Sequence, residues 1–240
     1  MKMDEKNYNV VEGFNVIAPA YDLANDAMTA GLHRVWRRQF CKLASESIPR
    51  GGKVLDVATG TGDVAFELCE LRGDIEVTAT DPSVGMLAQA KRKQEERPSN
   101  QLKKITFTAA DGRTLPYADN TFDVVTISWG IRNIKPYETA LNEMKRVLRP
   151  GGAVHILESG KPEFQAIKLF YKYYAKLLPL IGERISKFKP AYQYYTKSVE
   201  EFPSGTEFIA RLHELGFQKP QYKALAGGIV YLYSARKPTP

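Results

Sequence analysis

A short segment between residues 54 and 63 combines an acidic residue with two glycines, and this combination can bind a nucleoside cofactor. The segment reads Val54-Leu55-Asp56-Val57-Ala58-Thr59-Gly60-Thr61-Gly62-Asp63. Gly60 and Gly62 let the backbone turn sharply and approach a ligand, because neither has a Cβ. A turn of this kind after an apolar run is typical of sites at the carboxyl ends of parallel strands. The glycine pattern by itself is a weak signal.

Asp56 favours one nucleoside over the others. The sequence from Gly60 to Ala65 also nearly matches a dinucleotide-binding loop. A carboxylate at position 56 would repel the pyrophosphate of a dinucleotide and attract a cation, such as the amino group of an amino acid. S-adenosylmethionine carries that amino group and a sulfonium charge but no phosphate. We therefore expect S-adenosylmethionine as the cofactor, bound at Asp56, Gly60 and Gly62.

Two further acidic residues follow predicted strands. Residues 76–80 predict a strand that ends at Asp81, whose carboxylate can accept hydrogen bonds from both ribose hydroxyls. Asp81 lies 19 residues after Gly62, a spacing that dinucleotide enzymes share, so Asp81 does not discriminate between the two cofactors. Residues 105–109 predict a third strand that leads to Asp111 and Gly112, where Asp111 can accept a hydrogen bond from the adenine amine.

Composition and length place the chain among soluble globular proteins. Its 240 residues, 43% hydrophobic and 25% charged, suit one domain with an elaborated lid. Cys41 and Cys69 have no metal-ligand spacing and cannot form a disulfide framework, and the three histidines are scattered, so we expect a reducing compartment and no metal. Without a signal peptide or a membrane-spanning run, the expected location is the cytoplasm, with peripheral contact at the inner face of the cell membrane as a further option.

The order of predicted elements indicates an α/β fold with a doubly wound, seven-stranded, mostly parallel sheet. We expect one domain over residues 1–240, divided into an N-terminal helical cap (1–50), a cofactor-binding core (53–159), a helical lid insertion (160–205), and a C-terminal helix with strands (206–240). Predicted helices cover Asp63–Leu71, Ser83–Glu95, Tyr137–Val147 and Glu207–Leu215, and two closing strands cover Gln218–Ala224 and Gly228–Arg236.

The insertion carries most of the net charge of +7, because eight Lys or Arg residues and two Glu residues lie between positions 161 and 198. An apolar stripe at helical spacing runs through Ile167, Phe170, Tyr171, Tyr174, Leu177, Leu178 and Ile181, and Lys168, Lys172 and Lys176 follow on another face. Such a helix suits an anionic membrane surface, or a lid that buries its stripe in the core. The stripe is too aliphatic and regular to predict a nucleic-acid partner.

Four ordered motifs between Lys53 and Ser159 resemble the class I S-adenosylmethionine-dependent methyltransferases, which have a Rossmann-like fold. A more specific resemblance comes from Tyr21-Asp22-Leu23-Ala24-Asn25, followed by Gly31-Leu32-His33-Arg34-Val35-Trp36. This segment is similar to the first signature of the menaquinone/ubiquinone biosynthesis C-methyltransferases, although Ala24 and Thr29 replace the usual methionine and serine. Gly130-Ile131-Arg132-Asn133 matches that family's Gly-x-Arg-Asn, and Arg146 to Gly152, continuing through Leu157-Glu158-Ser159, resembles its second signature.

This resemblance implies that the chain methylates a ring carbon of a prenylated hydroquinone, such as demethylmenaquinol, with S-adenosylmethionine as donor. It implies cofactor contacts at Thr61, Asp81, Asp111, Gly112 and Ser128. The ubiquinol precursor stays open as a further acceptor, and so does a homo-oligomeric state. Two alternatives to this function are methylation of another lipidic or phenolic acceptor and a non-catalytic cofactor-binding subunit.

Carbon methylation beside a phenol suggests roles for three more residues. The ring carbon becomes nucleophilic when the adjacent hydroxyl loses or shares its proton, so a general base, acting directly or through water, is needed. Arg132, after the predicted fourth strand, is expected to stabilise the developing phenolate. Tyr21 is expected to close over the methionine moiety or to donate to the quinol, and His33 is the candidate base. A purely structural role for Tyr21 and for His33 stays open, and His155, inside a predicted strand, is expected to be structural.

Overall fold

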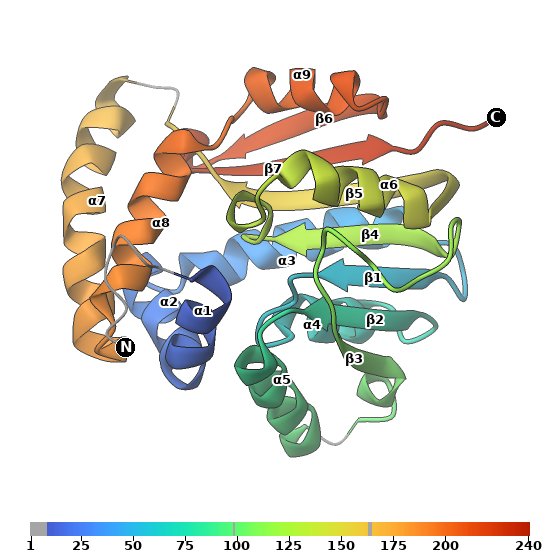
Figure 1. Ribbon diagram of the computed structural model, residues 1–240, viewed down its shortest axis with the longest axis horizontal. Coiled ribbons are helices and arrows are strands. Elements are labelled where there is room, and N and C mark those ends of the chain that lie inside the picture. Colours follow the sequence, from blue (N-terminus) through green and yellow to red (C-terminus); the bar gives the residue numbers. More distant parts are fainter. Residues whose placement is uncertain (1–8, 98, 163–164) are drawn as a thin grey trace.

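A single mixed sheet forms the centre of the computed structural model (Figure 1). The structure describes residues 9–97, 99–162 and 165–240, without the side chains of residues 166, 170, 172, 179, 182 and 189. Within this part of the chain the sheet has seven strands in the order β3-β2-β1-β4-β5-β7-β6. The strands are β1 (Lys53–Val57), β2 (Glu76–Asp81), β3 (Ile105–Ala109), β4 (Phe122–Ser128), β5 (Leu148–Ser159), β6 (Gln218–Leu225) and β7 (Val230–Arg236).

Strands β1 to β5 are parallel, whereas β7 is antiparallel to β5 and β6 is antiparallel to β7. The central strands read as apolar runs because helices cover both faces of the sheet. Helices α3 (Leu32–Glu46) and α4 (Asp63–Leu71) pack on one face, and α6 (Tyr137–Val147) and α9 (Thr206–Glu214) pack on the other. The doubly wound, mostly parallel sheet that the sequence predicts is therefore confirmed.

Most helix and strand boundaries predicted from the sequence lie within one or two residues of those in the structure. Ser83 caps α5 (Val84–Glu96), as predicted, because its Oγ accepts a hydrogen bond from the backbone N–H of Met86 at 3.1 Å. The last strand begins two residues later than the predicted Gly228, because Ala226–Gly228 forms a 3-10 turn with Gly227 at φ 66°. His155 lies inside β5 and is buried, with Nε2 3.0 Å from Ser47 Oγ, which fits its predicted structural place.

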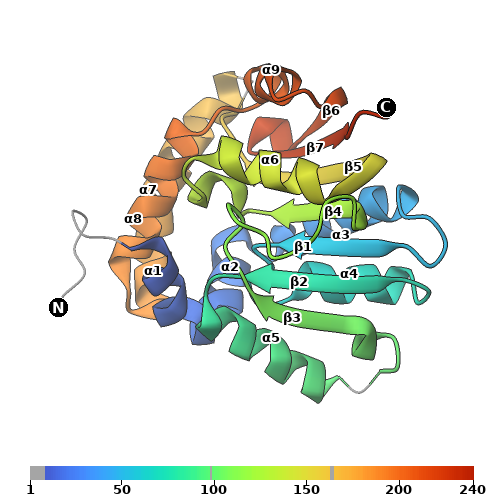
Figure 2. The ribbon, with the colours of Figure 1, turned by 45° about the vertical axis from the view of Figure 1, so that its right-hand side comes forward.

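The remaining helices gather at the carboxyl ends of the parallel strands. Figures 1 and 2 show α1 (Val10–Ile17), α2 (Tyr21–Thr29), α7 (Gln165–Ser186) and α8 (Lys189–Glu201) on the side to which the arrowheads of β1, β2 and β4 point. Segments from the two halves of the sequence therefore form one cap over the carboxyl ends of the strands. No helix in the described ranges is both long and apolar enough to cross a bilayer.

A polar cluster, which we call the cap latch, joins α2 to the glycine turn and to α4 and α5. Its members are Asp22, Thr61, Asp63 and Lys93. Lys93 Nζ lies 2.5 Å from Asp22 Oδ2 and 2.8 Å from Asp63 Oδ1, and it donates to Thr61 Oγ1 at 2.8 Å. Thr61 Oγ1 donates to Asp22 Oδ1 at 2.8 Å. The latch fixes where the cap begins relative to the core.

Gly62 and Gly31 provide a matched test of how the turn is packed. Both are N-cap residues in the left-handed region, with φ 85° before α4 and φ 77° before α3. A Cβ at Gly62 would lie 3.0 Å from Phe66 and 3.1 Å from Ala90, whereas a Cβ at Gly31 would meet nothing within 4 Å. We expect Gly31→Ala to lower the free energy of unfolding by about 1 kcal/mol, the backbone cost alone.

Gly62→Ala should add the cost of overpacking and lower the free energy of unfolding by about 2–4 kcal/mol. Urea titration followed by circular dichroism measures both variants. Equal losses would contradict the close packing of the turn between α4 and α5.

Candidate active site

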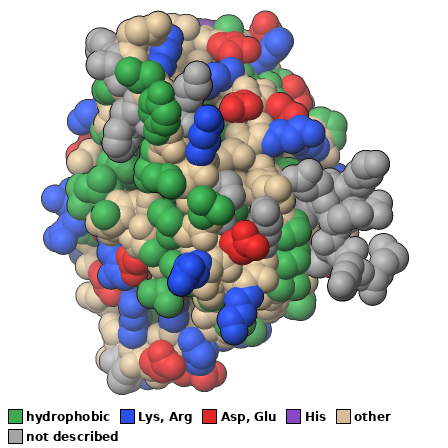
Figure 3. All heavy atoms as spheres, turned by 90° about the vertical axis from the view of Figure 1, so that its left-hand side faces the viewer, with side chains coloured by type: hydrophobic (Ala, Val, Ile, Leu, Met, Phe, Trp, Pro, Cys, Tyr) green, Lys and Arg blue, Asp and Glu red, His purple; other side chains and the backbone are tan. Residues whose placement is uncertain are grey.

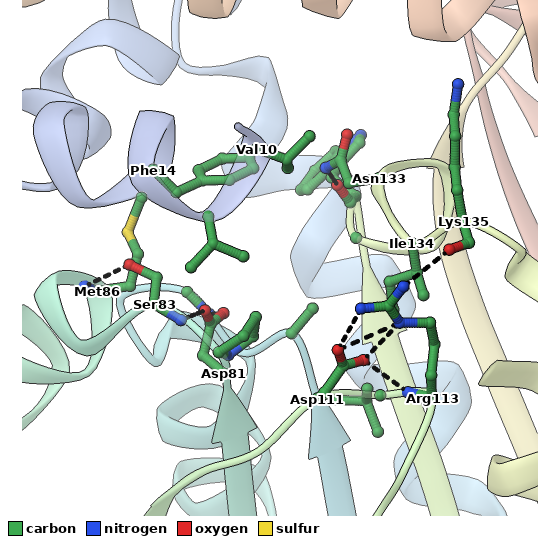
Figure 4. Close-up of a pocket in the computed structure, with 18 of the residues that line it drawn as sticks. Val10, Phe14, Asp81, Ser83, Met86, Asp111, Arg113, Asn133, Ile134 and Lys135 are labelled. Atoms are coloured by element: carbon green, nitrogen blue, oxygen red, sulfur yellow. Dashed lines mark hydrogen bonds and ion pairs between the residues drawn. The ribbon is translucent and has the colours of Figure 1, made fainter. Parts of the chain in front are cut away.

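A cavity of about 490 Å³ lies at the carboxyl ends of the central strands, below α1 (Figure 4). We call it the cofactor cavity. It brings together five residues that the sequence predicts to contact the cofactor. They come from the ends of strands and from the turns that follow them. They are Gly60, Asp81, Asp111, Gly112 and Ser128. Figure 4 shows Val10 and Phe14 of α1 facing Asp81 across this space.

Asp81 is held in place by the backbone around it. Its Oδ2 accepts from the N–H of Gly60 and its Oδ1 from the N–H of Ser83, both at 2.8 Å. Burial raises the pKa of Asp81 to about 6, so the carboxylate is mostly ionised at neutral pH. Each oxygen keeps a further lone pair for a hydroxyl donor, which suits a ribose diol.

Asp111 and Gly112 form another part of the wall. Asp111 pairs with Arg113 through Nη2 to Oδ2 at 2.6 Å, and this contact lowers the pKa of the carboxyl group. A Cβ at Gly112 would lie 2.9 Å from Ile134 and 3.2 Å from Val57. Glycine at this position keeps the crevice open, so the backbone can approach a flat ligand closely.

Asp56, Thr61 and Gly62 are not among the described residues that line the cofactor cavity. Asp56 lies beneath the turn, where Thr59 Oγ1 donates to Oδ2 at 2.6 Å and Thr126 Oγ1 donates to Oδ1 at 2.7 Å. Burial raises the pKa of Asp56 to about 7. The Thr61 hydroxyl belongs to the cap latch, and Gly62 packs beside Phe66. Direct contact of these three residues with a cofactor stays a prediction, and their visible role is to shape the turn.

A second cavity, of about 500 Å³, lies between α1, α2, the start of α3, α7 and α8. We call it the acceptor cavity. Its wall is largely apolar, with Ile17, Met28, Leu32, Trp36, Leu178 and Ile181 among its members. Five residues line both cavities, which therefore share a wall. These residues are Phe14, Tyr21, Trp129, Asn133 and Tyr194.

All three predicted catalytic residues border the acceptor cavity. Tyr21 lies in the shared wall, and Arg132 and His33 lie elsewhere on the cavity surface. Burial raises the pKa of Tyr21 to about 12, so its hydroxyl stays protonated and can only donate a proton in a hydrogen bond to an anion. A hydrogen-bond donor at this place suits a developing phenolate.

Arg132 belongs to a buried ion pair that sequence analysis did not predict. Its Nη1 lies 2.6 Å from Glu158 Oε1 and donates to the Trp129 carbonyl at 2.8 Å. Glu158 is fully buried, and Arg132 is 7% exposed. Burial alone would lower the pKa of Arg132, but Glu158 together with Tyr195 and Tyr21 raises it above its usual value. Arg132 is therefore a permanent cation whose position is set by Glu158.

Trp129 was also missed, although it lies between the predicted Ser128 and the Gly130 motif. Trp129 and Ala58 both have φ 51°, an uncommon value for residues with a side chain. They follow β4 and β1, the two adjacent strands from which the chain turns in opposite directions. Glu158 did carry a sequence signal, because a carboxylate follows the apolar residues Ile156 and Leu157.

The described residues contain no group of three or more His, Cys, Asp or Glu side chains that could hold a metal ion. The two cavities are lined by carboxylates, hydroxyls, the guanidinium groups of Arg113 and Arg132, the ammonium group of Lys135, the imidazole of His33 and apolar side chains.

Comparison with known proteins agrees with this geometry. Residues 1–237 match the ubiE/COQ5 methyltransferase family. A Rickettsia felis protein, ubiquinone/menaquinone biosynthesis C-methyltransferase UbiE, is 42% identical over 230 residues, which cover 93% of this chain and 90% of that protein. A protein of the same name from Rickettsia bellii is 40% identical over 243 aligned positions, which cover 99% of this chain and 96% of that protein.

Solved structures share the fold at low sequence identity. A SAM-dependent methyltransferase from Aquifex aeolicus is 22% identical, with a TM-score of 0.59 over 82% of this chain and 88% of that one. A possible histamine N-methyltransferase from Thermotoga maritima is 17% identical, with a TM-score of 0.65 over 95% of this chain and 100% of that one. Together with the family match and the relatives at 40% identity or more, these findings show that the chain belongs to the ubiE/COQ5 methyltransferase family.

Proposed function

We propose that this protein is an S-adenosylmethionine-dependent C-methyltransferase that acts on the ring of a prenylated hydroquinone. The acceptor would be demethylmenaquinol, the corresponding ubiquinol precursor, or both. The observation that carries this proposal is the wall of five residues shared by the cofactor cavity, which carries the carboxylates of Asp81 and Asp111, and the largely apolar acceptor cavity. A methyl donor in the cofactor cavity and a prenylated ring in the acceptor cavity would meet at that wall.

The residues of the cofactor cavity fit S-adenosylmethionine. When bound, it supplies a methyl group on a positively charged sulfur. Asp81 offers carboxylate oxygens to the ribose hydroxyls, the narrow crevice at Gly112 and the ion-paired Asp111 suit the adenine, and Ser128 would hold the methionine side.

On the acceptor side, Arg132 and Tyr21 would act on the quinol oxygen. The guanidinium and the phenol are fixed before the acceptor binds, so they can stabilise a developing phenolate without reorganising. The aromatic and aliphatic wall would orient the ring and exclude water. Orientation of the ring carbon toward the shared wall then contributes much of the rate acceleration.

A methyl-transfer assay with labelled S-adenosylmethionine tests this function. The acceptors are reduced demethylmenaquinone and the demethylated ubiquinone precursor in detergent, and product mass and methyl position are determined. Methylation of a ring carbon supports the proposal, and the relative rates give the preferred head group. Intact cofactor binding without transfer to either acceptor would overturn it.

Variants of the Arg132–Glu158 ion pair can separate its contribution to protein stability from its contribution to turnover. Glu158→Gln should lower the free energy of unfolding by about 3 kcal/mol, because it leaves the charge of Arg132 buried without a partner. The double variant Arg132→Met/Glu158→Leu removes both charges and should recover most of that loss. Its turnover should nevertheless fall about 100-fold or more, with cofactor affinity nearly unchanged, because the oxyanion partner is gone.

Thermal melts, calorimetry of cofactor binding and the methyl-transfer assay provide these three readouts. Normal turnover by the double variant would contradict the role of Arg132. A large loss of cofactor affinity in that variant would instead place Arg132 with the donor.

We also propose that the protein reaches its acceptor at an anionic membrane surface. The predicted stripe of α7 faces inward at Tyr171, Tyr174, Leu178 and Ile181, which line the acceptor cavity. The side chains of Phe170 and Lys172 lie outside the described ones. Leu177, which the sequence placed in the same stripe, instead faces outward. It belongs to what we call the outer apolar surface: Leu23, Leu32, Val35, Leu169, Tyr173, Leu177 and Leu180, each more than half exposed.

Charge and continuity support this surface as a lipid contact. Figure 3 shows hydrophobic side chains gathered on this face of the molecule, with Lys and Arg among them. Lys168, Lys176, Arg184 and Lys187 are exposed on or directly after α7. Leu32 is 51% exposed and also lines the acceptor cavity, so the cavity reaches the surface within the apolar patch. A prenyl tail could then leave the cavity directly into lipid.

Vesicle binding tests the membrane contact. Leu177→Gln and Leu180→Gln should each weaken binding to phosphatidylglycerol/phosphatidylcholine vesicles about tenfold, because each removes a leucine from the lipid. Leu71→Gln changes an exposed leucine at the end of α4 and serves as the control. Equal binding by all variants, or no dependence on anionic lipid, would contradict the contact. Sedimentation would show whether a second copy of the chain covers the surface instead.

A further inference from the structure

His33 separates the acceptor cavity from a smaller polar pocket of about 150 Å³. The polar pocket is lined by charged side chains of α2, α3, α4 and α5, including Asp22, Arg37, Asp63, Glu67, Lys93 and Arg97. Among the described lining residues, His33 alone belongs to both compartments. Its imidazole could therefore pass a proton from the acceptor cavity to the charged polar pocket.

The acceptor cavity offers few other proton acceptors. Apart from His33, the titratable side chains among its described lining residues are Arg132 and five tyrosines. Burial raises the pKa of Tyr21 and of Tyr174 to about 12, above the usual value for a phenol, so these groups hold their protons. Arg132 is permanently charged. An imidazole nitrogen is therefore the atom in this wall best able to accept a proton near neutral pH.

Hydrogen bonds fix which nitrogen that is. Thr29 Oγ1 donates its hydrogen to the Asn25 carbonyl at 2.7 Å. The contact of 2.8 Å between Thr29 Oγ1 and His33 Nδ1 must therefore be donated by Nδ1–H. In the neutral ring Nε2 then carries the free lone pair. Asp26 Oδ1 lies 3.7 Å from Nε2 and can stabilise a proton that arrives there.

The surrounding charges keep this nitrogen unprotonated at rest. Burial, followed by the nearby Arg37 cation, lowers the pKa of His33, and Arg34 acts in the same direction. Asp26 and Asp63 oppose these effects. Asp26 is itself engaged by Arg34, whose Nε donates to Oδ1 at 2.7 Å. Together these effects favour a neutral imidazole at rest, which is protonated only transiently during turnover.

We infer that His33 Nε2 accepts the proton released by ring methylation in the acceptor cavity and discharges it to the polar pocket. In this reaction one S–CH3 bond breaks with its electron pair left on sulfur, and one ring C–CH3 bond forms. The methylated carbon then loses its hydrogen as a proton, so the ring becomes aromatic again and one proton leaves in each turnover. No oxidant is required. This inference rests on the proposed function.

The pH dependence of turnover tests the inference, because neighbours of His33 should move it in opposite directions. Activity should fall as the pH decreases through the pKa of His33, since the protonated ring cannot accept. Asp26→Asn removes a carboxylate that raises this pKa, so the acidic limb should shift to lower pH. Arg37→Gln removes a cation that lowers it, so the limb should shift to higher pH. Unmoved limbs, or shifts in the same direction, would overturn the inference.

His33→Gln should lower turnover about 100-fold at neutral pH without changing cofactor affinity, and added imidazole should restore part of the rate. A variant with normal turnover would overturn the proton-acceptor role. Nitrogen-15 NMR gives a readout that needs no acceptor: the neutral ring should carry its proton on Nδ1, and a proton on Nε2 would overturn the inference. If the wild-type protein methylates no quinol while the NMR result is as expected, the proposed acceptor is wrong. If methylation is normal and the limbs do not move, only the role of His33 is wrong.

Discussion

The buried ion pair between Arg132 and Glu158 is the interaction on which the arrangement of both cavities depends. Removing two charges from water costs several kcal/mol per ion, and only good geometry with further hydrogen bonds offsets that cost. Here Arg132 also donates to the Trp129 carbonyl, Glu158 accepts from the Ser159 N–H at 2.7 Å, and the guanidinium carbon lies 4.9 Å from the centre of the Tyr195 ring. These partners belong to the turn after β4, to β5 and to α8. The ion pair therefore connects three segments that are separate in the sequence.

Polar contacts fix the cap at several points, with apolar packing between them; Asn15 of α1, for example, accepts hydrogen bonds from Ser83 Oγ and the Gly85 N–H. Tyr195 and Ser159, whose hydroxyl oxygens lie 3.1 Å apart, hold α8 at the ion pair, and the cap latch holds α2 at the glycine turn. Apolar contacts alone tolerate repacking, whereas charged contacts of fixed geometry specify one register. The acceptor cavity lies between these two anchors.

Sequence patterns predicted the parts of the fold that depend on local signals. The apolar run before Asp56, the N-cap at Ser83 and the strand ending at Asp81 all follow from periodicity and short-range hydrogen bonding, and the mostly parallel sheet is the one expected from alternating strands and helices. The site was predicted less completely, because its decisive contacts join distant residues. Nothing near Glu158 shows that it meets Arg132, 26 positions earlier, and nothing near Thr61 shows that its hydroxyl turns to Asp22. The left-handed backbone at Trp129 likewise has a distant partner, because its N–H donates to the Leu157 carbonyl at 2.7 Å.

The two faces of α7 connect the cavity to the molecular surface. A helix with two apolar faces is stable when protein covers one of them and a second apolar environment covers the other. Tyr171, Tyr174, Leu178 and Ile181 satisfy the first condition in the acceptor cavity, while Tyr173, Leu177 and Leu180 leave the second condition unmet in water. Lipid would meet it, and the opening at Leu32 lies within the same surface. Under the proposed function, the prenyl tail need never enter water, and only the polar head group would move into the cavity to reach the shared wall.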